Sequence, residues 1–405
     1  MQKFRLKTGG KINRSKPIKF FFNNKEYEGY EGDTLASALL ANGVSVVGRS
    51  FKLRRPRGIF CAGVEEPNAI MQVGQNETLE PNLKATEVIL KDGLKVKSTK
   101  GWPSLDFDVG KINDIFSNIL SAGFYYKTFM KPAWLWKFYE KFIRQAAGFS
   151  HSPKFSDPGL YEHRNAHCDV MIVGGGPSGL TAAMVAGRSG ARVIIADDQT
   201  EFGGALLNTN QKINSKPAKA WIESIISELS ELPNVTLLNH STVFGYHDHN
   251  FLTIIENCNQ RIRQRAWRIR AEQVILAQGS FERPLVFCNN DRPGIMLASA
   301  ISTYINRYAV CPGNNAVIFT NNDSAYQTAI DLNNAGAKVK AIIDNRDHAS
   351  STLIDAAKNA GIDVFHRHVI IDVIGEKRIK TVIIGKLDKT KINIIDSPKE
   401  INCDL

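Results

Sequence analysis

The chain has 405 residues, of which 43% are hydrophobic and 22% are charged. This composition is typical of a soluble globular protein, and the length predicts two or three domains. No apolar run approaches the ~18 residues of a membrane span. The basic first ten residues also lack the apolar core of a secretory signal. We therefore expect a cytoplasmic protein without a membrane partner.

The formal net charge of +11 is spread over the whole length and interleaved with acidic residues. This distribution disfavours nucleic acid as a partner. The densest basic run, residues 49–57, predicts either a docking surface for an acidic partner or an internal ion-pair cluster. The six cysteines include no C-x-x-C, so neither a disulfide framework nor a zinc site is predicted. The pairs His247/His249 and His366/His368 lack a third ligand, and no metal site is predicted.

Residues 1–100 predict a small α+β domain of the β-grasp type. Asn23 and Asn24 form a turn-forming pair between two apolar runs, and Asp33 or Thr34 can cap the helix that follows. The predicted elements are a hairpin of 18–22 and 25–30, a helix over 33–42, and strands at 69–73 and 87–90.

Residues 101–165 are rich in aromatic side chains that recur every three to four positions among lysines, which predicts amphipathic helices. We expect these helices to pack against a neighbouring domain or subunit; a helix on a membrane surface is the alternative. Residues 153–159 predict a linker. The aromatic residues are Phe116, Phe124, Tyr125, Tyr126, Phe129, Trp134, Trp136, Phe138, Tyr139 and Phe142.

The third predicted domain, residues 166–405, opens on a strand that enters a G-x-G-x-x-G turn followed by a helix of small residues. Gly174 permits the tight turn, Gly176 lets the backbone approach a pyrophosphate, and Gly179 lets the helix sit close to the strand. The next strand, 191–196, ends on Asp197, which is placed to accept hydrogen bonds from ribose hydroxyls. The order of strand, glycine turn, helix, strand and acid predicts dinucleotide binding in a Rossmann-like α/β fold.

Further residues complete the predicted site. The backbone N–H of Ser178 is the best single donor to a pyrophosphate because Pro177 has none. The glycine pair at 203–204 lets backbone pass close to the cofactor, and Val243 is a candidate for the adenine edge. The predicted cofactor-binding residues are Gly174, Gly176, Pro177, Ser178, Gly179, Asp197, Asp198, Gln199, Gly204, Ala205, Val243 and Gly279; no catalytic residue is predicted.

A second β-α-β unit is expected at 315–344, within an inserted region of about 312–390. Residues 320–325, Thr-Asn-Asn-Asp-Ser-Ala, stand where phosphate-binding glycines would be needed. Asp323 would place a negative charge at the phosphate position, so we expect no second nucleotide. Closing strands are predicted at 364–375 and 380–387, and the final run 400–405 reads as the opening of a strand that is cut short.

The order of these parts resembles the α subunits of heterotetrameric sarcosine oxidases over nearly the whole chain. That resemblance implies a complex that oxidises sarcosine to glycine, with the methyl carbon leaving as formaldehyde or passing to tetrahydrofolate and oxygen becoming hydrogen peroxide. The segments that carry it are residues 28–44, 54–60, 65–69, 174–179, 201–204, 282–287, 291–298 and 319–326.

The resemblance implies NAD in this chain, with flavin chemistry, on FMN or FAD, mainly in a β subunit, and with smaller subunits completing the complex. It also implies a ferredoxin-like domain without its cluster, and Cys61 is the only cysteine of that domain. Family members continue into a folate-binding half, so we expect either a fragment or a separate chain for the remainder. Gln278 stands where related oxidoreductases carry threonine.

The glycine motif is equally compatible with FAD, which stays open as the alternative cofactor. Two other functions also stay open at this point. One is a subunit of a related FAD-dependent amine or proline dehydrogenase, or of an opine- or cyanide-forming oxidase. The other is a non-catalytic docking scaffold with a structural nucleotide.

Overall fold

The computed structural model describes residues 2–112, 131–258, 261–347, 352–390 and 393–405. The chain forms two units: unit 1 comprises Met1–Ser156 and Glu282–Leu405, and unit 2 comprises Asp157–Phe281. The first boundary lies inside the predicted linker 153–159. Residues 166–405, expected as one domain, are divided between the units, and the proposed boundaries at residues 100 and 165 remain predictions.

The N-terminal part of unit 1 is a five-stranded sheet in the order β2-β1-β7-β5-β6, covered by helix α1. β1 and β7 are parallel and the other pairs are antiparallel. Asn23 and Asn24 adopt positive φ at the predicted hairpin turn, and Thr34 caps α1 as expected. The bounds are β1 Asn13–Phe22, β2 Lys25–Glu31, α1 Leu35–Ala41, β5 Ile70–Val73, β6 Glu80–Lys84 and β7 Leu94–Ser98.

Two details of this region differ from expectation. The strand predicted at 87–90 is reduced to a single bridge between Thr34 and Ile89, and the sheet instead uses β6 and β7. Residues 48–57 form a short hairpin of β3 (Gly48–Arg49) and β4 (Pro56–Arg57). Short 3-10 turns occupy Asn76–Thr78 and Val109–Lys111.

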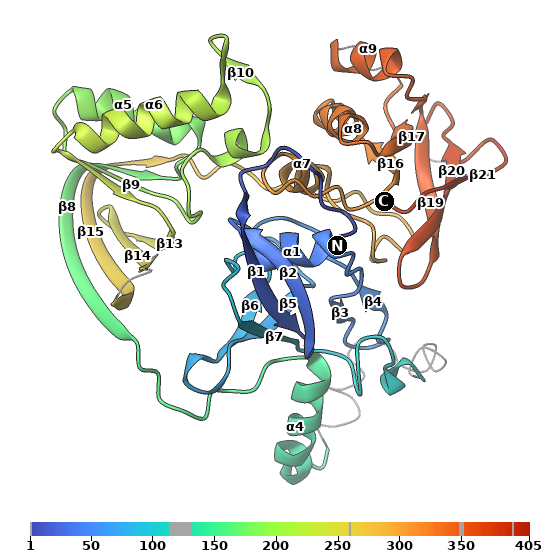
Figure 1. The fold of residues 1–405 in the computed structure, drawn as a ribbon, viewed down its shortest axis with the longest axis horizontal. Coiled ribbons are helices and arrows are strands. Elements are labelled where there is room, and N and C mark those ends of the chain that lie inside the picture. The colour runs from blue at the N-terminus through green and yellow to red at the C-terminus, as the bar shows by residue number, and fades with distance from the viewer. Residues whose placement is uncertain (1, 113–130, 259–260, 348–351, 391–392) are drawn as a thin grey trace. The chain divides into compact units, whose positions relative to one another are not determined.

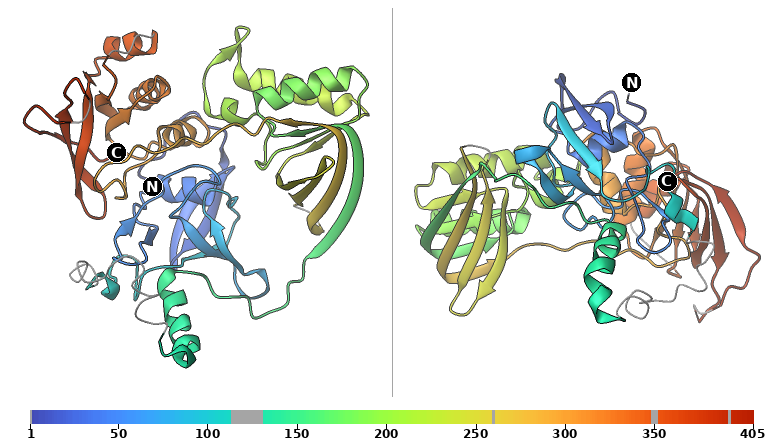
Figure 2. Two further views of the ribbon diagram at one scale, coloured as in Figure 1. Left: turned by 180° about the vertical axis from the view of Figure 1, so that it is seen from behind. Right: turned by 90° about the horizontal axis from the view of Figure 1, so that it is seen from below.

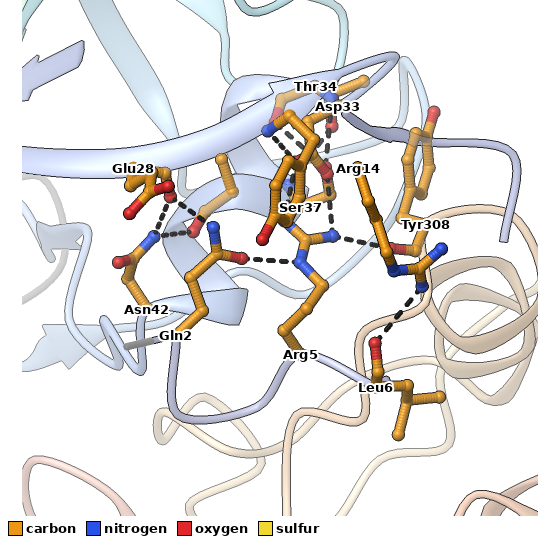
Figure 3. Close-up of polar contacts among 12 residues, drawn as sticks. Gln2, Arg5, Leu6, Arg14, Glu28, Asp33, Thr34, Ser37, Asn42 and Tyr308 are labelled. Atoms are coloured by element: carbon orange, nitrogen blue, oxygen red, sulfur yellow. Dashed lines mark hydrogen bonds and ion pairs between the residues drawn. The ribbon is translucent and has the colours of Figure 1, made fainter. Parts of the chain in front are cut away.

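The segment before residue 13 connects the first sheet to the C-terminal part of unit 1. Arg5 pairs with the buried carboxylate of Asp33 at 2.6 Å and donates to the carbonyl of Tyr308 at 2.6 Å (Figure 3). Asp33 also accepts from Ser37 Oγ, which belongs to the reciprocal cap of α1. This buried network holds residues 2–6 between α1 and the chain that follows helix α7 (Ala298–Asn306).

The C-terminal part of unit 1 has three layers around a parallel sheet of β16-β17-β18 (Figures 1 and 2). Helices α7, α8 and α9 share one core with β16 and β17. The antiparallel sheet β19-β20-β21 packs on the other face of β17. The bounds are α7 Ala298–Asn306, β16 Asn315–Thr320, α8 Ser324–Asn334, β17 Lys338–Asp344, α9 Thr352–Asn359, β18 Val364–His366, β19 His368–Gly375, β20 Ile379–Lys386 and β21 Lys399–Asn402.

Unit 2 is a six-stranded sheet in the order β12-β9-β8-β15-β14-β13, of which the first four strands are parallel. Helices α5 and α6 cover one face, and residues of β14 and β15 contribute to the core on the other (Figure 1). The bounds are β8 Leu160–Val173, α5 Pro177–Arg188, β9 Val193–Ala196, η4 Gly204–Asn208, β10 Lys212–Ile213, β11 Lys216–Pro217, α6 Ala218–Glu231, β12 Val235–Leu238, β13 Ser241–His247, β14 Phe251–Asn257 and β15 Ile262–Leu276.

In the aromatic segment, the predicted amphipathic helix is present as α4 (Trp136–Ala147), preceded by a 3-10 turn at Ala133–Leu135. Phe138 and Phe142 lie exposed on it, with ring centroids 5.0 Å apart. The expectations for Phe116, Phe124, Tyr125, Tyr126 and Phe129 lie outside the described residues. Within the described ranges, no helix is long and apolar enough to cross a membrane.

Candidate functional site

The glycine turn after β8 is enforced by backbone contacts. Gly174 has φ of +102°, and a Cβ there would lie 2.4 Å from the carbonyl oxygen of Ala277. A Cβ on Gly179 would lie 1.9 Å from the carbonyl oxygen of Gly174. Neither position tolerates a side chain, so the predicted roles of both glycines in tight turning and close packing have a direct steric basis.

The N terminus of α5 is open to a ligand. Gly176 is the N-cap, Pro177 takes the first helical position, and no described side chain caps this end of the helix. The first backbone N–H groups of a helix have no intrahelical acceptors, and the helix dipole is positive there. Ser178 is exposed and Gly179 is buried. This arrangement suits a phosphate anion.

The second glycine pair lies against the first turn. The N–H of Gly203 donates to the carbonyl of Gly175 at 2.8 Å. A Cβ on Gly204 would lie 2.8 Å from the Cα of Gly176, so the two loops touch through backbone. Ala205 is exposed in η4, immediately after this contact. The predicted close approach therefore joins residues 203–204 to the turn itself.

Asp197 stands at the end of β9 with 8% of its surface exposed. One carboxylate oxygen accepts the N–H of Gly175 at 2.6 Å, and the other accepts the N–H of Gln199 at 2.9 Å. Its carboxylate thus braces the turn, a role that was not predicted from the residues alone. Each oxygen of an ionised carboxylate retains a second acceptor position, which leaves capacity for a ribose hydroxyl. Asp198 is exposed beside it.

The remaining predicted residues lie in different surroundings. Val243 is partly buried and packs on the core on the face of the sheet opposite α5 and α6. Gly279 has φ of +73°, and a Cβ there would meet no atom within 4 Å. Ala277, rather than Gly279, makes the close contact with Gly174.

Two further residues shape the turn and were not predicted as site residues. A Cβ on Gly175 would lie 2.2 Å from the ring of Phe202 and 3.1 Å from the Cβ of Asp197. The run of three glycines at 174–176 was the signal that could have identified Gly175.

The second β-α-β unit, β16-α8-β17, is built differently at the same edge. Asp344, fully buried, accepts from the hydroxyl of Tyr326 at 2.8 Å and from Arg346 Nη2 at 2.7 Å. Arg346 Nη1 also pairs with Asp323 at 2.8 Å. Burial opposes ionisation of Asp344, but the hydrogen bonds from Arg346 and Tyr326 outweigh it and hold the pKa of Asp344 below its ordinary value. The absence of a second nucleotide remains a prediction.

A third polar centre lies in the loop after β4. The buried carboxylate of Glu66 accepts backbone N–H groups of Phe60, Cys61, Asn68 and Ala69 at 2.7–3.0 Å. Burial raises the pKa of Glu66, and these four donors act in the opposite direction. Burial also raises the pKa of the Cys61 thiol, so this cysteine is a poor source of thiolate.

No group of three or more metal-ligating side chains occurs among the residues that the structure describes. The predicted pair His366 and His368 is held locally: Nδ1 of His368 lies 2.7 Å from the carbonyl oxygen of His366.

Two family models match the chain. Residues 15–101 match the 2Fe-2S iron-sulfur cluster binding domain, and residues 168–405 match the pyridine nucleotide-disulphide oxidoreductase family. A 2Fe-2S cluster needs four ligands, usually thiolates. Residues 15–101 contain one cysteine and no histidine, so their donor set does not fit such a cluster.

The chain is similar to curated relatives that are named as α subunits of sarcosine oxidase. It is 48% identical over 358 residues to that of Rhizobium meliloti (strain 1021), covering 86% of this chain and 36% of the relative. It is 35% identical over 396 residues to that of Corynebacterium sp. (strain P-1), covering 94% and 36%. The chain thus spans about a third of the length of these relatives.

Among solved structures, the chain resembles L-proline dehydrogenase from P. horikoshii, with a TM-score of 0.60 and 21% identity. The match covers 100% of this chain and 61% of that one, and it supports the fold. The family model over 168–405 spans more than half of the chain and includes the glycine turn, Asp197 and both β-α-β units. The chain therefore belongs to the pyridine nucleotide-disulphide oxidoreductase family, whose fold is that of FAD- and NAD(P)-binding oxidoreductases.

Proposed function

We propose that this chain is the dinucleotide-binding portion of the α subunit of a sarcosine oxidase complex. The observation that carries the proposal is the steric and polar build of the glycine turn, joined to 48% identity with a sarcosine oxidase α subunit. In this proposal the complex oxidises sarcosine to glycine, releases formaldehyde or methylene-tetrahydrofolate, and reduces oxygen to hydrogen peroxide. The chain is one part of that oxidoreductase.

The chain's own residues hold the dinucleotide. The N terminus of α5, with Ser178 N–H as the first free donor, binds the pyrophosphate. Gly176, where a Cβ would meet only the Cα of Gly204 at 3.9 Å, lets the pyrophosphate approach the backbone. Asp197 accepts ribose hydroxyls with the lone pairs that its two backbone bonds leave, with Asp198 and Gln199 at the rim. A carboxylate there repels a 2′-phosphate, which favours NAD or FAD over NADP. Ala205 borders the turn in η4, and we keep Val243, for the adenine edge, and Gly279 as further candidates on the sequence pattern alone.

We assign NAD, with FAD as the alternative, and the choice rests on resemblance because the turn accepts either. Bound NAD would accept a hydride. Asp197 and Asp198 at the turn are assigned to the ribose, and we place the amine oxidation on flavin held mainly by a β subunit, as the resemblance to sarcosine oxidase α subunits implies. Tetrahydrofolate and FMN or FAD then belong to the rest of the complex, which we place in the cytoplasm.

We also propose that the ferredoxin-like domain carries no cluster. Two observations support this proposal. Residues 15–101 contain one cysteine and no histidine as possible cluster ligands, and backbone N–H groups of the loop after β4 donate to the Glu66 carboxylate. In a cluster-bearing domain, N–H groups of this kind donate to cluster sulfurs. Here one carboxylate takes four of them, so the loop is ordered without iron.

The alternative function is that of an opine oxidase component or a related FAD-dependent dehydrogenase. It is favoured by 25% identity over 183 residues to an opine oxidase subunit of Agrobacterium tumefaciens (strain Ach5). A visible spectrum of the purified chain separates the two assignments. Flavin absorbance that follows the protein would contradict the NAD assignment, whereas NAD released on denaturation of a colourless chain would support it.

The central test is Asp197→Ala, with Asp248→Ala as the matched control. Asp248 is an exposed carboxylate of the β13–β14 turn in the same unit, so the control repeats the charge change away from the glycine turn. We expect Asp197→Ala to lower dinucleotide affinity at least about tenfold, since hydrogen bonds to a charged group are lost. Equal affinities for the two variants would contradict the assigned site. A second experiment distinguishes an oxidase subunit from a non-catalytic docking scaffold. The chain is co-expressed with a β subunit, and the hydrogen peroxide formed on addition of sarcosine is measured.

A further inference from the structure

The middle glycine of the turn after β8, Gly175, is held on three sides. Its N–H donates to the carboxylate of Asp197 at 2.6 Å, and its carbonyl oxygen accepts the N–H of Gly203 at 2.8 Å. On the third side, the ring of Phe202 occupies the space into which a side chain would project, because a Cβ on Gly175 would lie 2.2 Å from Cδ1 of that ring. Two hydrogen bonds and one packed ring thus fix the position of this residue.

Packing, and not backbone conformation, is what requires a glycine at position 175. Gly174 adopts positive φ, whereas Gly175 does not, so the conformation of Gly175 does not itself exclude a Cβ. By position in the two six-residue runs, Gly175 corresponds to Asn321 of the second β-α-β unit, which is exposed. This position therefore accepts a side chain where it is open to solvent and excludes one where a ring lies against it.

Phe202 supports the turn from the side of the core. It is 6% exposed and packs between the sheet and the helices of unit 2, in one core with Leu180 of α5 and Leu229 of α6. The next residue, Gly203, lies against α6, since a Cβ there would be 2.7 Å from Cδ1 of Ile222. A ring buried in this position does not reach a ligand at the surface of the turn.

The proposed pyrophosphate donors follow Gly175 directly. They are the backbone N–H groups at the start of α5, among them that of Ser178. The loop that contains Phe202 also touches the residue between them, because a Cβ on Gly204 would lie 2.8 Å from the Cα of Gly176. Residues 202–204 therefore hold two successive residues of the turn just before the donors. The strength of a hydrogen bond depends on the direction and distance of its donor, so a shift of these residues would weaken the bonds to a ligand.

We propose that Phe202 is a positioning residue of the dinucleotide site, which sets the affinity for the dinucleotide by packing its ring against Gly175. This inference rests on the proposed function, because it takes the turn as the place where the pyrophosphate binds. Removal of the ring leaves a space beneath Gly175 into which the turn can relax, and a misplacement of about 1 Å can cost on the order of a hundredfold at a functional site. A ring that only filled the core would change stability and leave affinity as it is.

Calorimetric titration of the 405-residue chain with NAD, and in parallel with FAD, tests the proposal. Phe202→Leu keeps an apolar side chain in the core and removes the ring, and we expect it to weaken dinucleotide binding on the order of tenfold. Leu229→Ala is the matched control. Leu229 is fully buried in the same core, so its truncation should lower the denaturant midpoint and leave the dissociation constant unchanged. Equal dissociation constants for Phe202→Leu and the wild type would overturn the proposal, as would an equal loss of affinity in Leu229→Ala.

A pair of alanine substitutions tests the contact itself. In Gly175→Ala the new methyl group meets the ring of Phe202, and we expect no measurable dinucleotide binding. In the double variant Gly175→Ala/Phe202→Ala, the methyl group occupies space that the ring has left, so part of the affinity should return. A double variant that binds no better than Gly175→Ala would show that the ring does not set the position of the turn.

Amide hydrogen exchange in the ligand-free chain separates a failure of this proposal from a failure of the proposed function. We expect residues 174–180 to exchange faster in Phe202→Leu than in the wild type, because the bonds of Gly175 open more often, and not in Leu229→Ala. Unchanged exchange in Phe202→Leu would overturn the positioning role. A wild-type chain that binds neither NAD nor FAD would contradict the proposed function, whereas faster exchange in Phe202→Leu would still support the role of the ring.

Discussion

The two β-α-β units of this chain share a topology and differ at the edge where a dinucleotide would bind. In unit 2, Asp197 ends β9, keeps a small exposed fraction and braces a turn of three glycines through backbone N–H groups. In unit 1, Asp344 ends β17, is fully buried and is neutralised by Arg346. In the proposed function, an acid at a strand end serves a ligand only where the facing turn leaves backbone donors and space. The glycines decide which role the acid takes.

The largest expected effect comes from the glycine whose counterpart in the second unit is alanine. By position in the two six-residue runs, Gly179 corresponds to Ala325. Gly179→Ala places a Cβ 1.9 Å from the Gly174 carbonyl, so we expect a loss of roughly 3 kcal/mol or more in unfolding free energy and no measurable dinucleotide binding. Chemical denaturation and calorimetric titration measure the two effects.

The reciprocal change, Ala325→Gly, is the control. It should cost only about 1 kcal/mol, the ordinary penalty of glycine in a helix. Helix propensity alone predicts the opposite sign for Gly179→Ala, so a stabilised variant would contradict the steric explanation.

The next largest effect is expected at the ion pair of the second unit. Arg346→Met leaves the buried carboxylate of Asp344 with the Tyr326 hydroxyl as its remaining side-chain donor. We expect a loss of about 2–3 kcal/mol, below the full cost of breaking a buried pair because Arg346 is partly exposed. Arg188→Met removes the exposed pair with Glu228 in unit 2 and should cost less than about 1 kcal/mol.

Arg346→Met should also change how the free energy of unfolding depends on pH. The folded-state pKa of Asp344 is depressed, so its contribution to stability is present above the unfolded-state pKa and is lost as pH falls through the folded value. In Arg346→Met this loss should begin at a higher pH. Identical acid-unfolding midpoints for the variant and the wild type would show that Arg346 does not set the ionisation of Asp344.

Much of the dinucleotide turn could be predicted because its requirements are local. Three glycines, a strand before them and an acid at the end of the next strand are all readable within about 25 residues. The bond from Gly175 to Asp197 could not be read in this way, because it depends on how two strands align in the sheet. The contact between Gly174 and Ala277 likewise joins residues far apart in the chain.

The extent of β15 shows a second limit. The apolar run within residues 273–279 predicts a strand that begins at residue 273, whereas β15 begins at Ile262 in a run rich in arginine. Its arginines are held by acids on neighbouring strands, such as Glu162 and Glu256 with Arg265. Charge of this kind masks the alternation that marks a strand, because the pairing partners lie elsewhere in the sequence.

A smaller effect is expected from Asp197→Asn in the first unit. The amide keeps one acceptor oxygen but turns an NH2 group toward one of the two backbone donors, so one of the bonds to Gly175 or Gln199 is lost. We expect about 1–2 kcal/mol of destabilisation and dinucleotide binding weakened by about tenfold. Full affinity in this variant would show that Asp197 is solely a brace of the turn.

The smallest expected effect comes from Tyr326→Phe, which removes one donor from Asp344 and keeps the buried ring. The hydroxyl lies 2.8 Å from the carboxylate, and because Arg346 still neutralises the acid, we expect a loss of about 1 kcal/mol. Tyr246→Phe, which removes a bond of the same length to Asn250 on the surface of unit 2, should cost less than about 0.5 kcal/mol. If the two variants lose equal stability, the Tyr326 hydroxyl contributes no more to the free energy of unfolding than a surface hydrogen bond does. The difference between Asp344 at the end of β17 and Asp197 at the end of β9 would then depend on Arg346 alone.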